Sequence, residues 1–216
     1  MTKLDEIALN IELVLISIIE AVALTFLGDN ASHVLHSSEW PLFVPYVLAG
    51  LTILLVFWSQ AILHAVSFIR WPLSMEHMLL YFVAVFLQIL AYGSIDSVQM
   101  WFFWWSLFSI LALLIYVVDL HIIRRARSKF EHHQHGVAYI ADVERRHVNE
   151  LRYLVPIALA FNIGAALFAW YLPTALENPS VFIALGLLQF LISLGALIDC
   201  VRNFRARSKI LPTLFA

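Results

Sequence analysis

The chain has 216 residues, of which 62% are hydrophobic and 13% charged, and its mean hydropathy is +0.86. Soluble domains are about 45–50% apolar, so this composition indicates an integral membrane protein. The net charge of −2 gives no basic field that would attract nucleic acid, and the single Cys200 excludes an intrachain disulfide.

Six apolar runs follow one another along the chain, each long enough to supply the roughly 20 helical residues that cross a bilayer. They cover residues 7–27, 42–69, 77–95, 100–123, 151–172 and 180–201. The first run is too long for a signal-peptide core and lacks a small-residue cleavage site, so we expect it to be retained. Backbone groups in lipid must be satisfied within their own segment, and no barrel-like alternation occurs, so each run is expected to be a helix.

The predicted fold is therefore all-α, a single transmembrane domain over residues 1–216 with six transmembrane helices. Its helical hairpins cover residues 7–69, 77–123 and 151–201. Between the second and third hairpin, residues 124–150 are expected to form a short cytoplasmic helical hairpin that breaks at Gly136.

Basic residues fix the expected orientation. All thirteen Lys and Arg residues lie in alternate segments, mostly in the regions 124–152 and 202–209, and the other three loops have none. Because basic residues stay on the cytoplasmic side, both termini are predicted to be cytoplasmic. Aromatic residues at the opposite helix ends, such as Trp40, Trp101 and Trp170, agree with this orientation. A bacterial inner membrane is the expected location.

An internal repeat indicates duplication of a helical hairpin. Asp119 and the run at 125–129, Arg-Ala-Arg-Ser-Lys, recur 80 residues later as Asp199 and the run at 205–209. Upstream, Glu76 and Gln88 match Glu150 and Asn162 at an offset of 74 residues. These matches predict tandem parallel repeats, with the first hairpin as a diverged third copy.

Polar residues inside the apolar runs are the candidate functional groups. Glu20 lies near the middle of the first run, and a charge there costs about 2.5–3.5 kcal/mol, so it should face protein or water. Six further residues are candidates for lining a path or binding an ion: Glu12, Gln60, His64, Gln88, Asn162 and Gln189. The alternative interpretation is that the amides are interhelical hydrogen-bond contacts that hold the bundle together.

Asp119 and Asp199 precede the basic clusters at the inner interface. They are expected either to pair with Arg124 or Arg202, or to form an acidic inner mouth. The basic clusters are expected to contact anionic lipid.

Metal binding has weak candidates in two histidine groups, and otherwise these groups are solvated polar loops. One group is His132, His133 and His135, and the other is His33 and His36 beside Glu39. No cofactor is required by the sequence. A haem is a third possibility, ligated by two of His64, His77 and His121.

Three functional hypotheses follow. The leading one is a small ion or proton channel or transporter with a mid-membrane carboxylate, probably excluded from enzymatic work because no phosphate loop, metalloprotease helix or nucleophile elbow occurs. We expect it to be a homo-oligomer. The second is a non-transporting membrane subunit that docks a cytoplasmic protein or lipid through residues 124–150 and the basic tail. The third is the haem-binding membrane protein.

Overall fold

The computed structural model describes residues 3–66, 75–127 and 134–215, and those residues form helices joined by short turns, with no strand among them. The predicted all-α class is therefore confirmed. In chain order the helices are α1 (Lys3–Leu35), α2 (Trp40–Val66), α3 (Met75–Tyr92), α4 (Val98–Arg127), α5 (Gln134–Asn149), η2 (Glu150–Leu154), α6 (Val155–Tyr171), η3 (Pro173–Glu177) and α7 (Pro179–Phe215).

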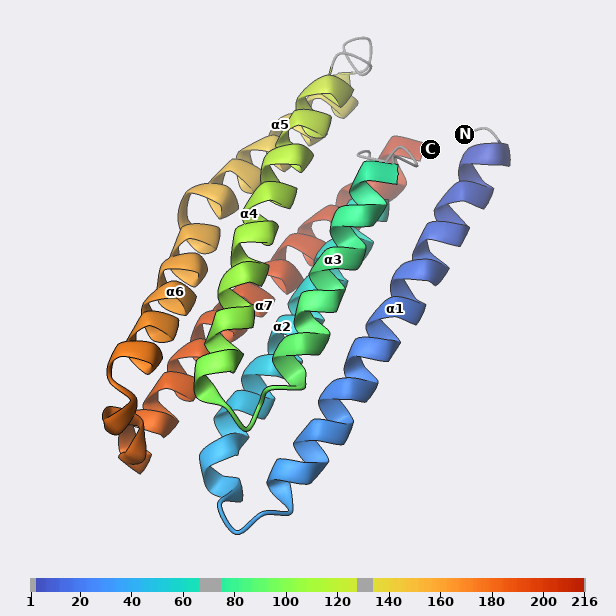
Figure 1. The fold of residues 1–216 in the computed structure, drawn as a ribbon. Helices are drawn as coiled ribbons and strands as arrows, with labels where there is room; N and C mark the ends of the chain where they lie inside the picture. The colour runs from blue at the N-terminus through green and yellow to red at the C-terminus, as the bar shows by residue number, and fades with distance from the viewer. Residues whose placement is uncertain (1–2, 67–74, 128–133, 216) are drawn as a thin grey trace.

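The long helices form a bundle of two layers (Figure 1). In one layer α6, α4, α3 and α1 lie side by side, because α4 packs against both α6 and α3, and α3 packs against α1. The second layer consists of α2 and α7, which pack along each other, and α2 also packs on α1. Both ends of the chain lie at the same end of the bundle, which we call the termini end.

Five helical stretches are long and apolar enough to cross a membrane. They are Leu13–Leu35, Trp40–Leu63, Val98–Arg125, Val137–Tyr171 and Pro179–Ala206. The remaining expected span, 77–95, is also helical, but its described apolar stretch, Leu79–Tyr92, is shorter than these five. Five of the six expected spans are thus confirmed as helices able to cross a bilayer.

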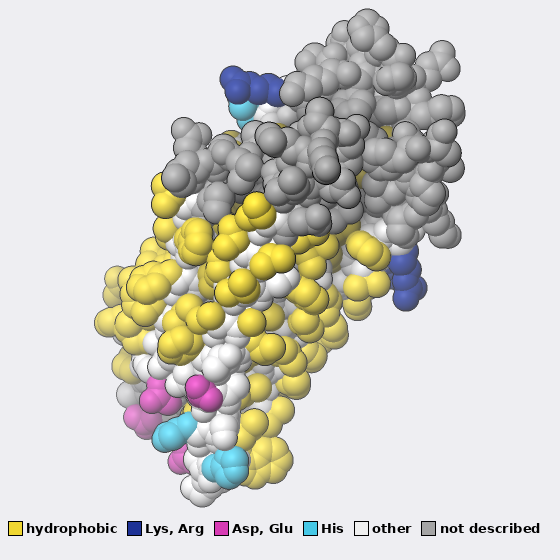
Figure 2. Space-filling model, turned by 90° about the vertical axis from the view of Figure 1, so that its right-hand side faces the viewer, with side chains coloured by type: hydrophobic (Ala, Val, Ile, Leu, Met, Phe, Trp, Pro, Cys, Tyr) yellow, Lys and Arg dark blue, Asp and Glu magenta, His cyan; other side chains and the backbone are white. Residues whose placement is uncertain are grey.

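The surface of the bundle is apolar around its middle. Large side chains such as Phe86, Leu167 and Leu191 are more than half exposed. Figure 2 shows this apolar belt between an end with acidic and histidine side chains and an end with Lys and Arg. A soluble monomer rarely exposes so much contiguous apolar surface, so the belt is consistent with a multi-pass membrane protein.

Helix α5 folds back along the termini end of α4, which agrees with the helical hairpin expected over residues 124–150. Glu144 on α5 accepts hydrogen bonds from Arg124 Nε at 3.0 Å and Arg127 Nη1 at 3.3 Å. Arg124, one of the expected partners of Asp119, is therefore paired with α5. The predicted break at Gly136 is wrong, because α5 begins at Gln134 and includes it. One glycine costs a helix only about 1 kcal/mol, which packing against α4 offsets.

Helices α5 and α6 are joined by η2, a π turn, into one continuous path. Pro156 follows this turn. A proline has no backbone N–H, and its ring crowds the carbonyl four residues earlier, here that of Arg152. A π turn inserts one residue into the helix and relieves this crowding, so the sequence supplies a local reason for it.

The expected duplication stays a prediction. Helices α3 and α4 pack along each other, whereas α6 packs mainly on α4 and α7 mainly on α2. The matched residues Gln88 and Asn162 are both buried, but Asp119 is buried while Asp199 is exposed. The two hairpins therefore differ in their environments even where their residues match.

Candidate functional site

Glu20 lies on the buried face of α1, in line with Ile16, Ala23 and Leu27 at spacings of three and four residues. Its side chain is 3% exposed. The Tyr81 hydroxyl donates a hydrogen bond to Glu20 Oε1 at 2.8 Å. Glu20 Oε2 has no hydrogen-bond partner in the described part of the chain. A carboxylate in this position has to bind a proton, a cation or water to offset its lost hydration.

Tyr81 connects Glu20 to an internal cavity. Its ring stacks on Phe57 of α2 with centroids 5.0 Å apart. Tyr81 also lines a cavity of about 110 Å³ between α2, α3 and α4, whose polar lining includes Gln60 and Asp119. The predicted candidates Gln60 and Asp119 are therefore close to the hydroxyl-bearing residue that binds Glu20.

A second cavity, of about 130 Å³, lies between α2, α4, α6 and α7. It shares a set of wall residues with the first: Ile53, Val56, Phe108, Ala112 and Tyr116. A water molecule takes up about 30 Å³ in the liquid, so each cavity has room for several where polar partners exist. The two cavities form adjoining spaces between the layers of the bundle.

Asn162 and Gln189 form a continuous hydrogen-bond chain between α4, α6 and α7. Trp101 Nε1 donates to Gln189 Oε1 at 2.7 Å, and Gln189 Nε2 donates to Asn162 Oδ1 at 3.0 Å. Asn162 Nδ2 then donates to Ser109 Oγ at 2.9 Å. Each of these amides binds a neighbouring helix through both its oxygen and its nitrogen, which favours the interpretation that they hold helices together.

Asn162→Leu is therefore expected to lower the free energy of unfolding by about 1–3 kcal/mol, because it leaves the buried Gln189 Nε2 without an acceptor. Chemical unfolding in detergent measures this. Ser193→Ala is the matched control, since Ser193 lines the same cavity but its hydroxyl bonds only to Phe190 O within α7. Equal stability of both variants would contradict a packing role for Asn162.

Gln88 is fully buried on α3, on the same side as Tyr81 and one turn before Tyr92. The Tyr92 hydroxyl lies 3.3 Å from Gln88 Oε1 and 3.1 Å from the Gly50 carbonyl oxygen, and donates toward both. Gln88 Nε2 has no hydrogen-bond partner among the described residues. Gln88 therefore continues the polar face of α3 toward the end of the bundle opposite the termini.

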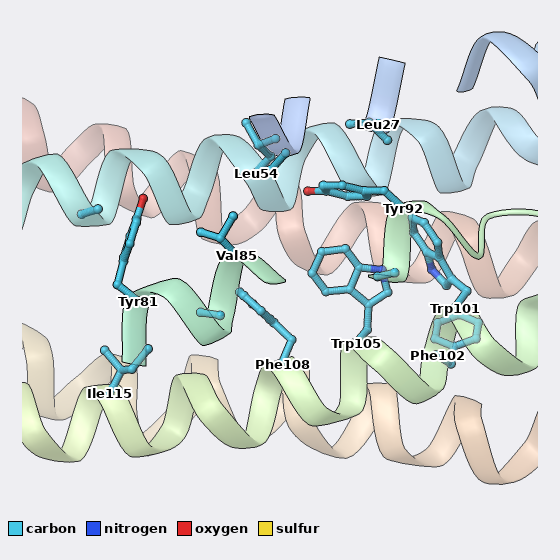
Figure 3. Packing of buried hydrophobic residues seen from close by; sticks show 14 of the residues in the cluster. Leu27, Leu54, Tyr81, Val85, Tyr92, Trp101, Phe102, Trp105, Phe108 and Ile115 are labelled. Carbon is cyan, nitrogen blue, oxygen red and sulfur yellow. The ribbon is translucent and has the colours of Figure 1, made fainter. Parts of the chain in front are cut away.

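Aromatic side chains fill that opposite half. Figure 3 shows Tyr92, Trp101, Phe102 and Trp105 gathered together, well away from Tyr81. These four and Tyr46 are at most 1% exposed. Trp101 and Trp105 pack edge to face with ring centroids 5.6 Å apart. This aromatic cluster closes the interior on the side where the 93–97 turn joins α3 to α4.

The predicted inner mouth is only partly correct. Asp119 is 1% exposed and lines the first cavity, whereas Asp199 is exposed on α7 and accepts a hydrogen bond from Asn203 Nδ2 at 3.1 Å. The two aspartates are thus in different places. Glu150, which we did not predict as a site residue, lies beside Asp199 and is 7% exposed. Its position 12 residues before Asn162, like Glu76 before Gln88, was the signal available in the sequence.

Several predicted residues are not brought into the site. Glu12 and His64 lie in α1 and α2, but their side chains are outside the described part, as are those of His77 and His135. His132 and His133 lie entirely outside it. His121, a haem candidate, is exposed on α4.

The outer histidines lie at the end of α1. His33 and His36 are exposed, and the ring of His36 contacts the Ser32 carbonyl oxygen through Nδ1 at 2.6 Å. Among the described residues no group of three or more His, Cys, Asp or Glu side chains is arranged to hold a metal ion. The metal and haem hypotheses stay predictions.

The fold and this interior define the class as an α-helical bundle with the properties of a multi-pass membrane protein, containing one buried carboxyl beside internal cavities. Comparison with protein-family models, curated proteins and solved structures finds no match. The function is therefore inferred from the site itself.

Proposed function

We propose that this protein is a transporter that moves protons across the membrane, with Glu20 as the proton-binding group. The observation that carries the proposal is the Glu20 carboxyl, which has one oxygen bound by Tyr81 and the other without a partner among the described residues. A buried carboxyl that served only for packing would not need an ionisable group. Ionisable residues inside a membrane bundle are commonly parts of proton relays.

The surroundings of Glu20 favour a proton over a metal cation. Hard cations such as Ca²⁺ take six or more oxygen ligands. The described hydrogen-bond partner of Glu20 is a hydroxyl that donates to it, which is an arrangement suited to proton exchange. Flux of another ion is an outcome that the test below distinguishes.

The shape of the interior favours a transporter over an open channel. The cavity walled by Tyr81 and Asp119 lies in the half toward the termini end, while the aromatic cluster fills the opposite half. Passage from Glu20 to that opposite side requires the packed helices to move. Such movement, exposing one site to each side in turn, is typical of transporters.

We further propose that the termini end faces the cytoplasm of a bacterial cell and contacts anionic lipid. The segregation of Lys and Arg at that end supports this orientation. A homo-oligomer within the membrane stays a prediction.

The non-transporting subunit stays the second candidate function. It is favoured by the exposed arginines of the α4–α5 hairpin, since the Arg124 and Arg145 side chains are 60% and 72% exposed while also holding ion pairs. Such a surface suits an acidic protein partner or lipid head groups. This candidate predicts that the purified protein carries no ions at all.

Proton flux into proteoliposomes tests the proposal. Vesicles that contain a pH-sensitive dye are driven by a potassium diffusion potential, and the rate of acidification is compared with that of protein-free vesicles. We expect a rate proportional to the amount of protein and unchanged when sodium replaces the other external cations. A rate equal to that of protein-free vesicles would contradict proton transport.

A further inference from the structure

Beside η2 the bundle has an open cavity of about 320 Å³ at the termini end. Its walls come from α5, η2 and α7 and are mostly polar. The lining residues are Arg146, Asn149, Glu150, Tyr153, Leu154, Asp199 and Asn203. We propose that this cavity is the site where protons enter or leave, that Glu150 is its proton-binding carboxyl, and that Tyr116 connects it to the interior. This inference rests on the proposed function and extends it to the inner side.

An amide joins the exposed and the buried carboxyl of this entry site. Asn203 Nδ2 donates to Asp199 Oδ2 at 3.1 Å and to Glu150 Oε1 at 2.9 Å. Arg146 Nη1 donates to Asn203 Oδ1 at 2.5 Å, which fixes the orientation of the amide because only its oxygen accepts. Asp199 is exposed and Glu150 is 93% buried, so the pair extends from solvent into the protein.

Tyr116 continues this path inward. Its hydroxyl donates to Glu150 Oε2 at 3.1 Å, and the residue lines both internal cavities. When Tyr116 gives its proton to Glu150 and takes one from water in a cavity, one proton moves to the entry site and the hydroxyl is unchanged. The reverse transfer, with the hydroxyl turned, moves one proton inward. Tyr81, on the wall of the first cavity, leads on to Glu20.

The groups around Glu150 leave it in an acidic setting. Arg146 from α5 is neutralised by Asp142, whose Oδ2 accepts from Arg146 Nε at 2.8 Å. His147, also from α5, stacks on the Tyr116 ring and contacts the Tyr116 carbonyl oxygen at 2.8 Å, so it holds that ring in place. Asp119 from α4 and Cys200 from α7 lie near the Tyr116 hydroxyl, and Asp199 completes the set.

The position of Glu150 in a π turn fits such a role. It is the first residue of η2, where the extra residue shifts the side chains of α5 relative to those of α6. Single π turns inside helices occur frequently at functional sites. Here the turn separates the entry cavity, lined by Glu150, from the second internal cavity, with Leu154 on the wall of both.

The test measures proton flux as a function of pH, with equal pH on both sides of the vesicle membrane. Acidic clefts raise the rate of arrival of a cation by 10-fold or more, so Glu150→Gln is expected to lower the flux about tenfold at alkaline pH, where protons are scarce. The loss should shrink as the pH falls. Tyr116→Phe should lower the flux at every pH, and Glu150→Asp should restore part of it. Glu144→Gln, on α5 but outside the cavity, is the matched control.

The outcomes separate this inference from the proposed function. Absence of flux in the unmodified protein contradicts both. Flux in the unmodified protein that is unchanged in Glu150→Gln and Tyr116→Phe overturns only the entry site. An equal loss at all pH values in Glu150→Gln, with no recovery in Glu150→Asp, also overturns it, because a purely structural defect behaves in that way.

Discussion

Replacement of Glu20 by glutamine is expected to lower proton flux in proteoliposomes at least about tenfold, a change equivalent to about 1.4 kcal/mol on the barrier. Glutamine has nearly the same size and keeps an oxygen that accepts the hydrogen bond from Tyr81. It does not bind and release a proton. The substitution therefore removes the chemistry and leaves the packing of α1 against α3 close to unchanged.

Two further variants make this result specific. Tyr81→Phe keeps the ring that stacks on Phe57 but removes the hydroxyl, and we expect it to lower the flux less than Glu20→Gln does. Glu177→Gln changes an exposed acid in η3, at the opposite end from the termini, and should leave the flux unchanged. Equal flux in the unmodified protein and in Glu20→Gln would remove Glu20 from the mechanism.

Gly186→Ala is expected to destabilise the bundle by about 1–3 kcal/mol, the usual cost of overpacking a core. A Cβ atom at this position of α7 would lie 2.8 Å from Tyr46 Cε2 and 3.0 Å from Pro45 Cβ. Tyr46 is fully buried and its hydroxyl donates to the Phe182 carbonyl oxygen at 2.8 Å. The ring is therefore held on both sides, and the close approach of α2 and α7 depends on this glycine.

Gly195→Ala is the matched control on the same helix. No heavy atom lies within 4 Å of a Cβ atom there, so the substitution should be neutral or should stabilise the helix by about 0.5–1 kcal/mol. Thermal or chemical unfolding in detergent compares the two variants. If Gly186→Ala were as stable as Gly195→Ala, the described packing of α2 on α7 would be wrong.

The helices and their alternating direction could be predicted from sequence because the features that set them are local. A run such as 180–201 is apolar throughout its length, and the runs of Lys and Arg at 124–129 and 202–209 mark one end of each hairpin. Glu20 also stands out locally, as a single acid within an apolar run. These properties do not depend on which helices become neighbours.

The partners of the polar groups could not be predicted, because they depend on packing between residues far apart in the chain. Tyr81 is 61 residues from Glu20, and Trp101 is 88 residues from Gln189. Nothing in the sequence around Tyr81 distinguishes a hydroxyl that binds a carboxyl from an ordinary core tyrosine. Glu150 was missed for a related reason, since an acid at the start of an apolar run is usually exposed to water.

The hydrogen exchange of the Glu20 carboxyl tests the central claim most directly. Infrared spectra of the reconstituted protein should contain a protonated carboxyl band that is absent in Glu20→Gln. If protons reach Glu20 through the internal cavities, this band shifts within minutes of transfer into D₂O, and the shift is slower in Tyr81→Phe. A Glu20 band that does not shift over hours would show a sealed carboxyl and would contradict proton transport through it.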